Sequence, residues 1–163
     1  MAFSTSSKLG VDFNNASGTQ QFTLGDLAVG NQDSLWVYAE CNGAVSTGDV
    51  CTITTAGTAT RCITSGGQDA SQQIIGFPQT SATSGQFVWM AQRGRALYVA
   101  VSATCNPSAA LYVATTSGKL STTSASSTIG GVALMAVSGT ATTAVVVANV
   151  VWPKWLAVTN GVG

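Results

Sequence analysis

Residues 86–101 read Gln86-Phe87-Val88-Trp89-Met90-Ala91-Gln92-Arg93-Gly94-Arg95-Ala96-Leu97-Tyr98-Val99-Ala100-Val101. This stretch decides the fold class, because two runs of β-branched and aromatic residues flank a short polar break. In the second run, alternation places Leu97, Val99 and Val101 on one face of a strand. The glycine of Arg93-Gly94 supplies the backbone freedom of a tight turn, so the stretch predicts a hairpin with strands over 86–92 and 95–101.

The same pattern extends in both directions along the chain. In the run Leu35–Cys41, alternation places Val37 and Ala39 on one face and Trp36 and Tyr38 on the other. Further strands are expected over residues 50–54, 58–63, 72–77, 110–115, 119–122, 129–137 and 141–152. We find no convincing amphipathic helix. The sequence therefore predicts an all-β fold, an antiparallel β-barrel or β-sandwich of about nine to eleven short strands with an extended N-terminal arm.

The last predicted strand, residues 141–152, lies in a stretch without any charge between Lys119 and Lys154. Both of its faces are apolar, so we expect it to be central in the sheet or covered by a neighbouring subunit. Its valines favour a strand, and Ser, Thr and Asn interrupt the roughly 20 apolar residues that a membrane-spanning helix needs. We therefore expect no membrane association.

We expect three segments: an N-terminal arm over residues 1–21, a single β domain over residues 22–152 and a C-terminal tail over residues 153–163. The arm is polar, with isolated phenylalanines. The tail begins within Trp152-Pro153-Lys154-Trp155, whose indoles either fold back onto the domain or dock in a partner's pocket, since interface anchors favour tryptophan. The candidate interface residues are Phe3, Phe13, Trp152, Pro153 and Trp155.

The charge content limits the function. The chain of 163 residues has six basic and six acidic side chains, no histidine and 7% charged residues, against about 25% in an average soluble domain. Six scattered cations cannot neutralise a run of phosphates, so we expect no nucleic-acid binding. A neutral surface with few charges promotes association, so we expect a homo-oligomer. The N-terminus lacks the apolar run of a secretory signal, so we expect synthesis in the cytoplasm.

Catalytic patterns are missing from the sequence. Without histidine the commonest general acid or base is absent, and neither a G-x-S-x-G elbow nor a lysine-containing phosphate loop occurs. The four cysteines, Cys41, Cys51, Cys62 and Cys105, are too widely spaced for a disulfide scaffold or a zinc site. We interpret them as small buried side chains, with a late disulfide within Cys41–Cys62 as the alternative. We expect no enzyme activity, no cofactor and no metal.

Several short motifs in the middle of the chain share one style, in which glycine alternates with short apolar strands. They are Ile74-Ile75-Gly76-Phe77-Pro78-Gln79, Gly85-Gln86-Phe87-Val88-Trp89, Gly94-Arg95-Ala96-Leu97-Tyr98-Val99, Leu111-Tyr112-Val113, Ser117-Gly118-Lys119-Leu120 and Ile129-Gly130-Gly131-Val132-Ala133-Leu134. Over about residues 35–137 the sequence resembles the small β-barrel head-decoration, or cement, proteins of tailed bacteriophages and related virion structural proteins.

That resemblance implies a virion protein on the exterior of an icosahedral capsid, commonly a trimer, that binds the major capsid protein and clamps neighbouring capsomers. No catalytic residue follows from the resemblance. Two alternatives stay open. One is a tail or head-fibre module that binds a host surface receptor, and the other is a non-viral adhesin or surface-layer module.

Overall fold

The structure of the chain is a computed structural model, and it describes residues 11–62, 74–102, 105–114, 118–123, 127–136 and 144–157. This part of the chain is all-β and contains no helix, which confirms the predicted fold class. The strands are β1 (Leu27–Val29), β2 (Leu35–Cys41), β3 (Cys51–Ile53), β4 (Thr58–Arg61), β5 (Ile74–Pro78), β6 (Phe87–Val101), β7 (Leu111–Val113), β8 (Leu120–Ser121), β9 (Ser127–Leu134) and β10 (Ala144–Ala157).

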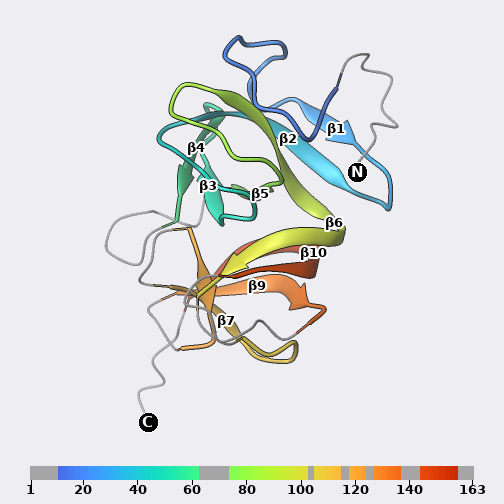
Figure 1. The fold of residues 1–163 in the computed structure, drawn as a ribbon, viewed down its shortest axis with the longest axis vertical. Helices are drawn as coiled ribbons and strands as arrows, with labels where there is room; N and C mark the ends of the chain where they lie inside the picture. Colours follow the sequence, from blue (N-terminus) through green and yellow to red (C-terminus); the bar gives the residue numbers. More distant parts are fainter. Residues whose placement is uncertain are drawn as a thin grey trace.

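The ten strands form one hydrogen-bonded sheet in the order β1-β2-β4-β3-β5-β6-β10-β9-β7-β8, with further pairings of β6 to β2 and to β8. These pairings close two rings that share β6. One ring contains β2, β4, β3, β5 and β6, and the other contains β6, β10, β9, β7 and β8. In Figure 1, β6 passes from the half with β3, β4 and β5 to the half with β7, β9 and β10. The β2–β4 and β6–β8 pairings are parallel, so the sheet is mixed rather than wholly antiparallel.

The predicted hairpin at Arg93-Gly94 is wrong, because β6 continues through it as one strand of 15 residues. The first half of β6 pairs with β2 up to Arg93, and the second half pairs with β10 from Arg93 to Val101. Between them the register skips, so that Asn149 of β10 faces two residues of β6, and Ala96 has a left-handed φ of 55°. Such a bulge bends a strand without reversing it. The polar break therefore marks the corner between the two rings.

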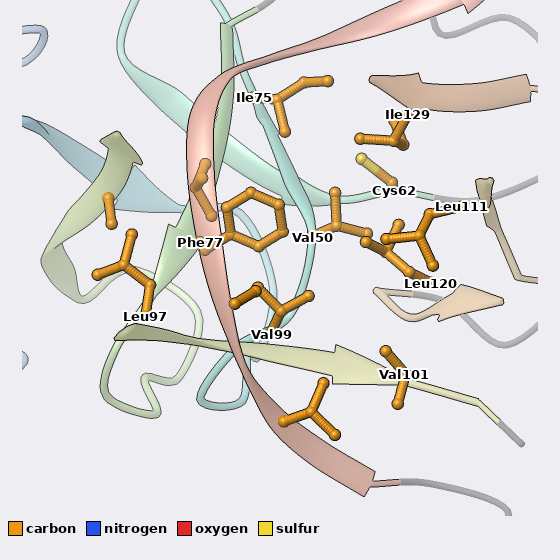
Figure 2. Close-up of a cluster of buried hydrophobic side chains, with 14 of the residues drawn as sticks. Val50, Cys62, Ile75, Phe77, Leu97, Val99, Val101, Leu111, Leu120 and Ile129 are labelled. Atoms are coloured by element: carbon orange, nitrogen blue, oxygen red, sulfur yellow. The ribbon is translucent and has the colours of Figure 1, made fainter. Parts of the chain in front are cut away.

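Two buried clusters fill the molecule. The smaller one contains Val37, Ala39, Cys41, Val45, Cys51, Ile53, Ala59, Ala82, Val88 and Met90. The larger one includes Trp36 and Tyr38 and extends into the second ring, where Val50 and Phe77 point toward Leu111 and Leu120 (Figure 2). The two faces of β2 thus enter different clusters, which confirms the predicted alternation.

Within the expected arm over residues 1–21, the structure describes residues 11–21 and places Phe13 in the core. The Phe13 side chain is fully buried, with its ring 4.4 Å from that of Trp36 and nearly parallel to it, and it also contacts the edge of Trp89. The backbones of Ser17 and Phe87 exchange hydrogen bonds of 2.9 and 2.8 Å. Large indole faces on the outer side of β2 and β6 need an apolar cover, and Phe13 supplies it.

Strand β10 also continues beyond Trp152, where we expected the domain to end. Its last residues pair with β9, from Lys154 opposite Gly130 to Ala157 opposite Ser127. Pro153 cannot donate a backbone hydrogen bond, but it lies where the register between β10 and β9 skips, so no ladder bond is lost there. Part of the predicted C-terminal tail is therefore strand.

A buried ion pair connects the two rings. The carboxylate of Asp49 is fully buried, accepts a hydrogen bond from the backbone N–H of Ser46 and lies 2.7 Å from Lys119 Nζ, next to β8. Arg61 Nη1 at the end of β4 lies 3.9 Å from the same carboxylate. Gly118 adds backbone bonds to Val50 and Cys62. The turn before β8 is thereby held against β3 and β4.

Candidate interaction surface at Trp152

A wide bulge in β10 sets the position of Trp152. Residues 151–153 of β10 face the single residue Gly131 of β9, because the register passes from Val150 opposite Val132 to Lys154 opposite Gly130. A Cβ atom on Gly131 would collide with the carbonyl oxygen of Val151 and lie 2.9 Å from that of Trp152. Only glycine therefore lets the bulge close onto β9. Bulges of this kind re-aim side chains, and here the re-aimed side chain is an indole.

The backbone of Trp152 has a φ of 48°, a left-handed conformation that is a genuine outlier for a bulky residue. Its indole is 52% exposed, and the guanidinium of Arg93 lies 5.4 Å from the ring centroid. Arg93 is held in turn by Asp33, whose carboxylate and backbone carbonyl accept hydrogen bonds of 2.7 and 3.1 Å from its guanidinium. Strained backbone of this kind gathers at functional sites, so Trp152 is a candidate contact residue.

Trp152 forms one wall of an apolar groove of about 400 Å³ at the end of the first ring. We call it the Trp152 groove and define it by its lining residues, Gly25, Leu27, Leu35, Val37, Ile74, Ile75, Gln92, Trp152 and Pro153. Leu27 of β1 and Ile74 of β5 are 51% and 42% exposed. None of these described lining residues is charged. Scattered apolar side chains are ordinary on a surface, but apolar side chains gathered around one hollow mark an interaction site.

One polar group lies at the base of this groove. Gln92 is 6% exposed and lies where the register between β6 and β2 skips, and its side-chain amide has no hydrogen-bond partner within the described part of the chain. Buried amides are almost always hydrogen-bonded in native proteins, because an unpaired one loses its contacts with water and gains nothing. Gln92 therefore points to a group that enters the groove from outside.

The structure places the residues that we predicted for an interface in different surroundings. Trp152 and Pro153 line the same groove, whereas Phe13 is buried among aromatic rings of the core. Phe3 and the side chain of Trp155 lie outside what the structure describes, although the backbone of Trp155 pairs with Ile129. Sequence reasoning missed Leu27, Ile74 and Gln92 as groove residues. They are distant in sequence, and only the pairing of β1 with β2 and the closure of the first ring bring them to Trp152.

A second exposed apolar feature lies on the outer face of β10. Val146, Ala148 and Val150 are buried, while Val145 on the opposite face is 50% exposed. β10 lies between β6 and β9, so the prediction of a central strand is confirmed. Its outer valine face is open to a neighbouring molecule.

The cysteine thiols are buried and unreactive. All four cysteines are free and buried, as we expected, and loss of hydration raises the pKa of Cys41 to about 11 and that of Cys62 to about 12. Both thiols are therefore protonated at neutral pH and poor nucleophiles. Within the described residues no group of three or more acidic or cysteine side chains is arranged to hold a metal ion. No helix in the same part of the chain is long and apolar enough to cross a membrane.

Comparison with protein-family models, with curated proteins and with solved structures finds no match for this chain. The Trp152 groove therefore has to be interpreted from its own geometry.

Proposed function

We propose that this chain is a virion structural protein that decorates and stabilises an icosahedral bacteriophage capsid by binding across neighbouring capsomers of the major capsid protein. The observation that supports this function is the Trp152 groove, an apolar hollow without charged lining beside a half-exposed indole held in strained backbone. Tryptophan is enriched among the residues that dominate binding energy at protein interfaces. A modest contact of this kind holds firmly when it is repeated over a shell.

The composition supports the same function. A surface with few charges is suited to being covered by other subunits, and the exposed outer face of β10 at Val145 offers a place for self-association. We propose a homo-oligomer, with a trimer favoured by the resemblance to decoration proteins. Sedimentation equilibrium of the purified chain tests this, and a monomer at all concentrations would contradict it.

Capsid binding is tested by cosedimentation of the purified chain with capsids from a phage that lacks the gene. Trp152→Ala should weaken binding about tenfold or more, because truncation of a central interface tryptophan costs at least 1.4 kcal/mol. Met135→Ala is the matched control, since Met135 is apolar and 56% exposed but does not line the groove. Equal binding by both variants would contradict the assignment of the Trp152 groove to the capsid.

The alternative function, a tail or head-fibre module that binds a host receptor, is favoured by a different observation. A second groove of about 310 Å³ contains the half-exposed Tyr98 ring together with Asn14, Gln32 and Gln79. An aromatic ring beside side-chain amides suits a saccharide, which offers an apolar face and many hydroxyl groups. Binding of host cells that Tyr98→Ala abolishes and Trp152→Ala spares would favour this alternative over capsid decoration.

A further inference from the structure

We propose that the Trp152 groove binds an extended, uncharged peptide segment whose backbone amide group pairs with the side chain of Gln92. This inference rests on the proposed function in one respect: the proposed function identifies the bound segment as part of the major capsid protein. The groove and its buried amide are features of the chain itself.

The first step is the unpaired amide. The Gln92 side chain offers two donor hydrogens and one acceptor oxygen, is 6% exposed and has no side-chain partner within the described residues. The other residues that line the groove present glycine, aliphatic, proline and tryptophan side chains. The occupant must therefore bring both a donor and an acceptor to the base of a hollow that is otherwise apolar. A peptide group provides this pair, and a glutamine amide matches it in geometry.

The second step is electrostatic. A charged group in the groove would lose its hydration without meeting an opposite charge, because none of the described residues that line the groove is acidic or basic. The guanidinium of Arg93, which contacts the Trp152 ring, is already engaged by Asp33 at 2.7 Å. The groove therefore favours an uncharged segment with aliphatic side chains.

The third step is the extended conformation. Strand β1, which supplies Leu27 to the groove, pairs with β2 and with no other strand of the described part of the chain. An extended peptide can lie along such an edge and place alternate side chains in the neighbouring apolar groove, without using the backbone groups of Val29, which already has a partner. A helix or a compact loop would keep its own amides paired and leave Gln92 unsatisfied.

The stability of the isolated chain provides the first test. Gln92→Met keeps the length of the side chain and removes its unpaired amide, so the melting temperature should rise by about 2–4 °C. The matched control is Gln79→Met. The Gln79 amide accepts a hydrogen bond of 2.8 Å from the backbone N–H of Tyr98 and donates one of 3.1 Å to its carbonyl, so this variant should melt lower. A fall in melting temperature for Gln92→Met would overturn the inference, because it would mean that the amide is already paired within the chain.

The second test uses an acetylated and amidated octapeptide with leucine and serine at alternate positions. Titration should shift the NMR signals of the Gln92 side-chain amide and the Trp152 indole, and Gln92→Met should weaken binding about tenfold. The same peptide with every backbone amide nitrogen methylated lacks the backbone donors, so it should bind wild type and Gln92→Met equally weakly. No shift with the unmodified peptide, or equal affinity of wild type and Gln92→Met, would overturn the inference. Peptide binding without capsid binding would instead contradict only the proposed function.

Discussion

At the scale of single residues, Trp152 carries the most information. Its left-handed backbone is unfavourable for any side chain with a Cβ atom, and the chain accepts this cost where an indole is held half-exposed beside an apolar groove. Truncating the indole to alanine keeps the backbone strain, whereas glycine removes it. The two substitutions therefore separate the strain from the contacts of the ring.

We predict that Trp152→Gly is more stable than Trp152→Ala by about 1 kcal/mol, as measured by urea denaturation. The control is the same pair of substitutions at Val151, which is exposed and is not among the residues with positive φ. There the alanine variant should be the more stable one by about 0.5–1 kcal/mol, because glycine is unfavourable in an ordinary strand. The same order at both positions would contradict the strained backbone.

The buried thiols predict a loss of stability in alkali. Burial raises the pKa of Cys41 from 9.0 to about 11 and that of Cys62 to about 12, so between pH 9 and 11 the unfolded chain loses protons that the folded chain retains. The stabilisation is complete below pH 9 and falls as the pH rises, by at most about 1.4 kcal/mol per pH unit for each thiol.

Denaturation at pH 8 and pH 10 measures this effect. A variant with Cys41→Ala and Cys62→Ala should be less stable at pH 8, because it loses buried side chains, but should lose less stability between the two pH values. An identical loss in wild type and variant would contradict the raised pKa values.

At the scale of elements, the sequence predicts which face of a strand is buried better than it predicts which strands pair. Alternation in residues 35–41 assigns Val37 and Tyr38 to opposite faces correctly, because burial on each face acts on single residues. The corner of β6 at Arg93-Gly94 is misread as a hairpin, because the partners that extend the strand, β2 and β10, are distant in sequence. The burial of Phe13 is missed for the same reason.

The residues of the Trp152 groove likewise fall into those that the sequence indicates and those that it does not. Trp152 and Pro153 stand out in the sequence, because an indole next to a strand-breaking proline is unusual in a buried strand. Ile74 and Gln92 give no such signal, since each is an ordinary member of a predicted strand. Their role appears only when the first ring closes and brings both to the groove.

The bulge between β9 and β10 gives a prediction at this scale. Gly131→Ala should destabilise the protein by about 2 kcal/mol or more, because the new methyl group meets the backbone of Val151 and Trp152 and the residue must keep a φ of 80°. Gly18→Ala is the control, since a Cβ atom there meets nothing within 4 Å, and it should change stability by less than about 0.5 kcal/mol. Similar effects in urea denaturation would contradict the described bulge.

At the scale of the whole molecule, two rings share one strand, and a buried carboxylate helps to join them. Asp49→Asn should cost about 3–5 kcal/mol, because it leaves the largely buried Lys119 ammonium without its counter-charge. Asp33→Asn breaks an exposed ion pair with Arg93 and should cost less than about 1 kcal/mol. Calorimetric unfolding measures both. A small effect of Asp49→Asn would contradict a role of the ion pair in joining the rings.

The same architecture is compatible with the proposed role in an assembly. The rings bury their apolar interiors, while the Trp152 groove and the outer face of β10 remain exposed. In the proposed function, one surface contacts the shell and the other contacts copies of the same chain. A decoration protein needs both kinds of contact, since it must bind neighbouring capsomers and associate with itself.

The number of copies of this chain in each purified phage particle tests the proposed function most directly, and quantitative mass spectrometry against the major capsid protein measures it. Capsid decoration predicts a high copy number in a fixed stoichiometric ratio to the shell protein, as icosahedral symmetry requires. A copy number that fits only the tail or a single vertex, or the absence of the chain from particles, would contradict it.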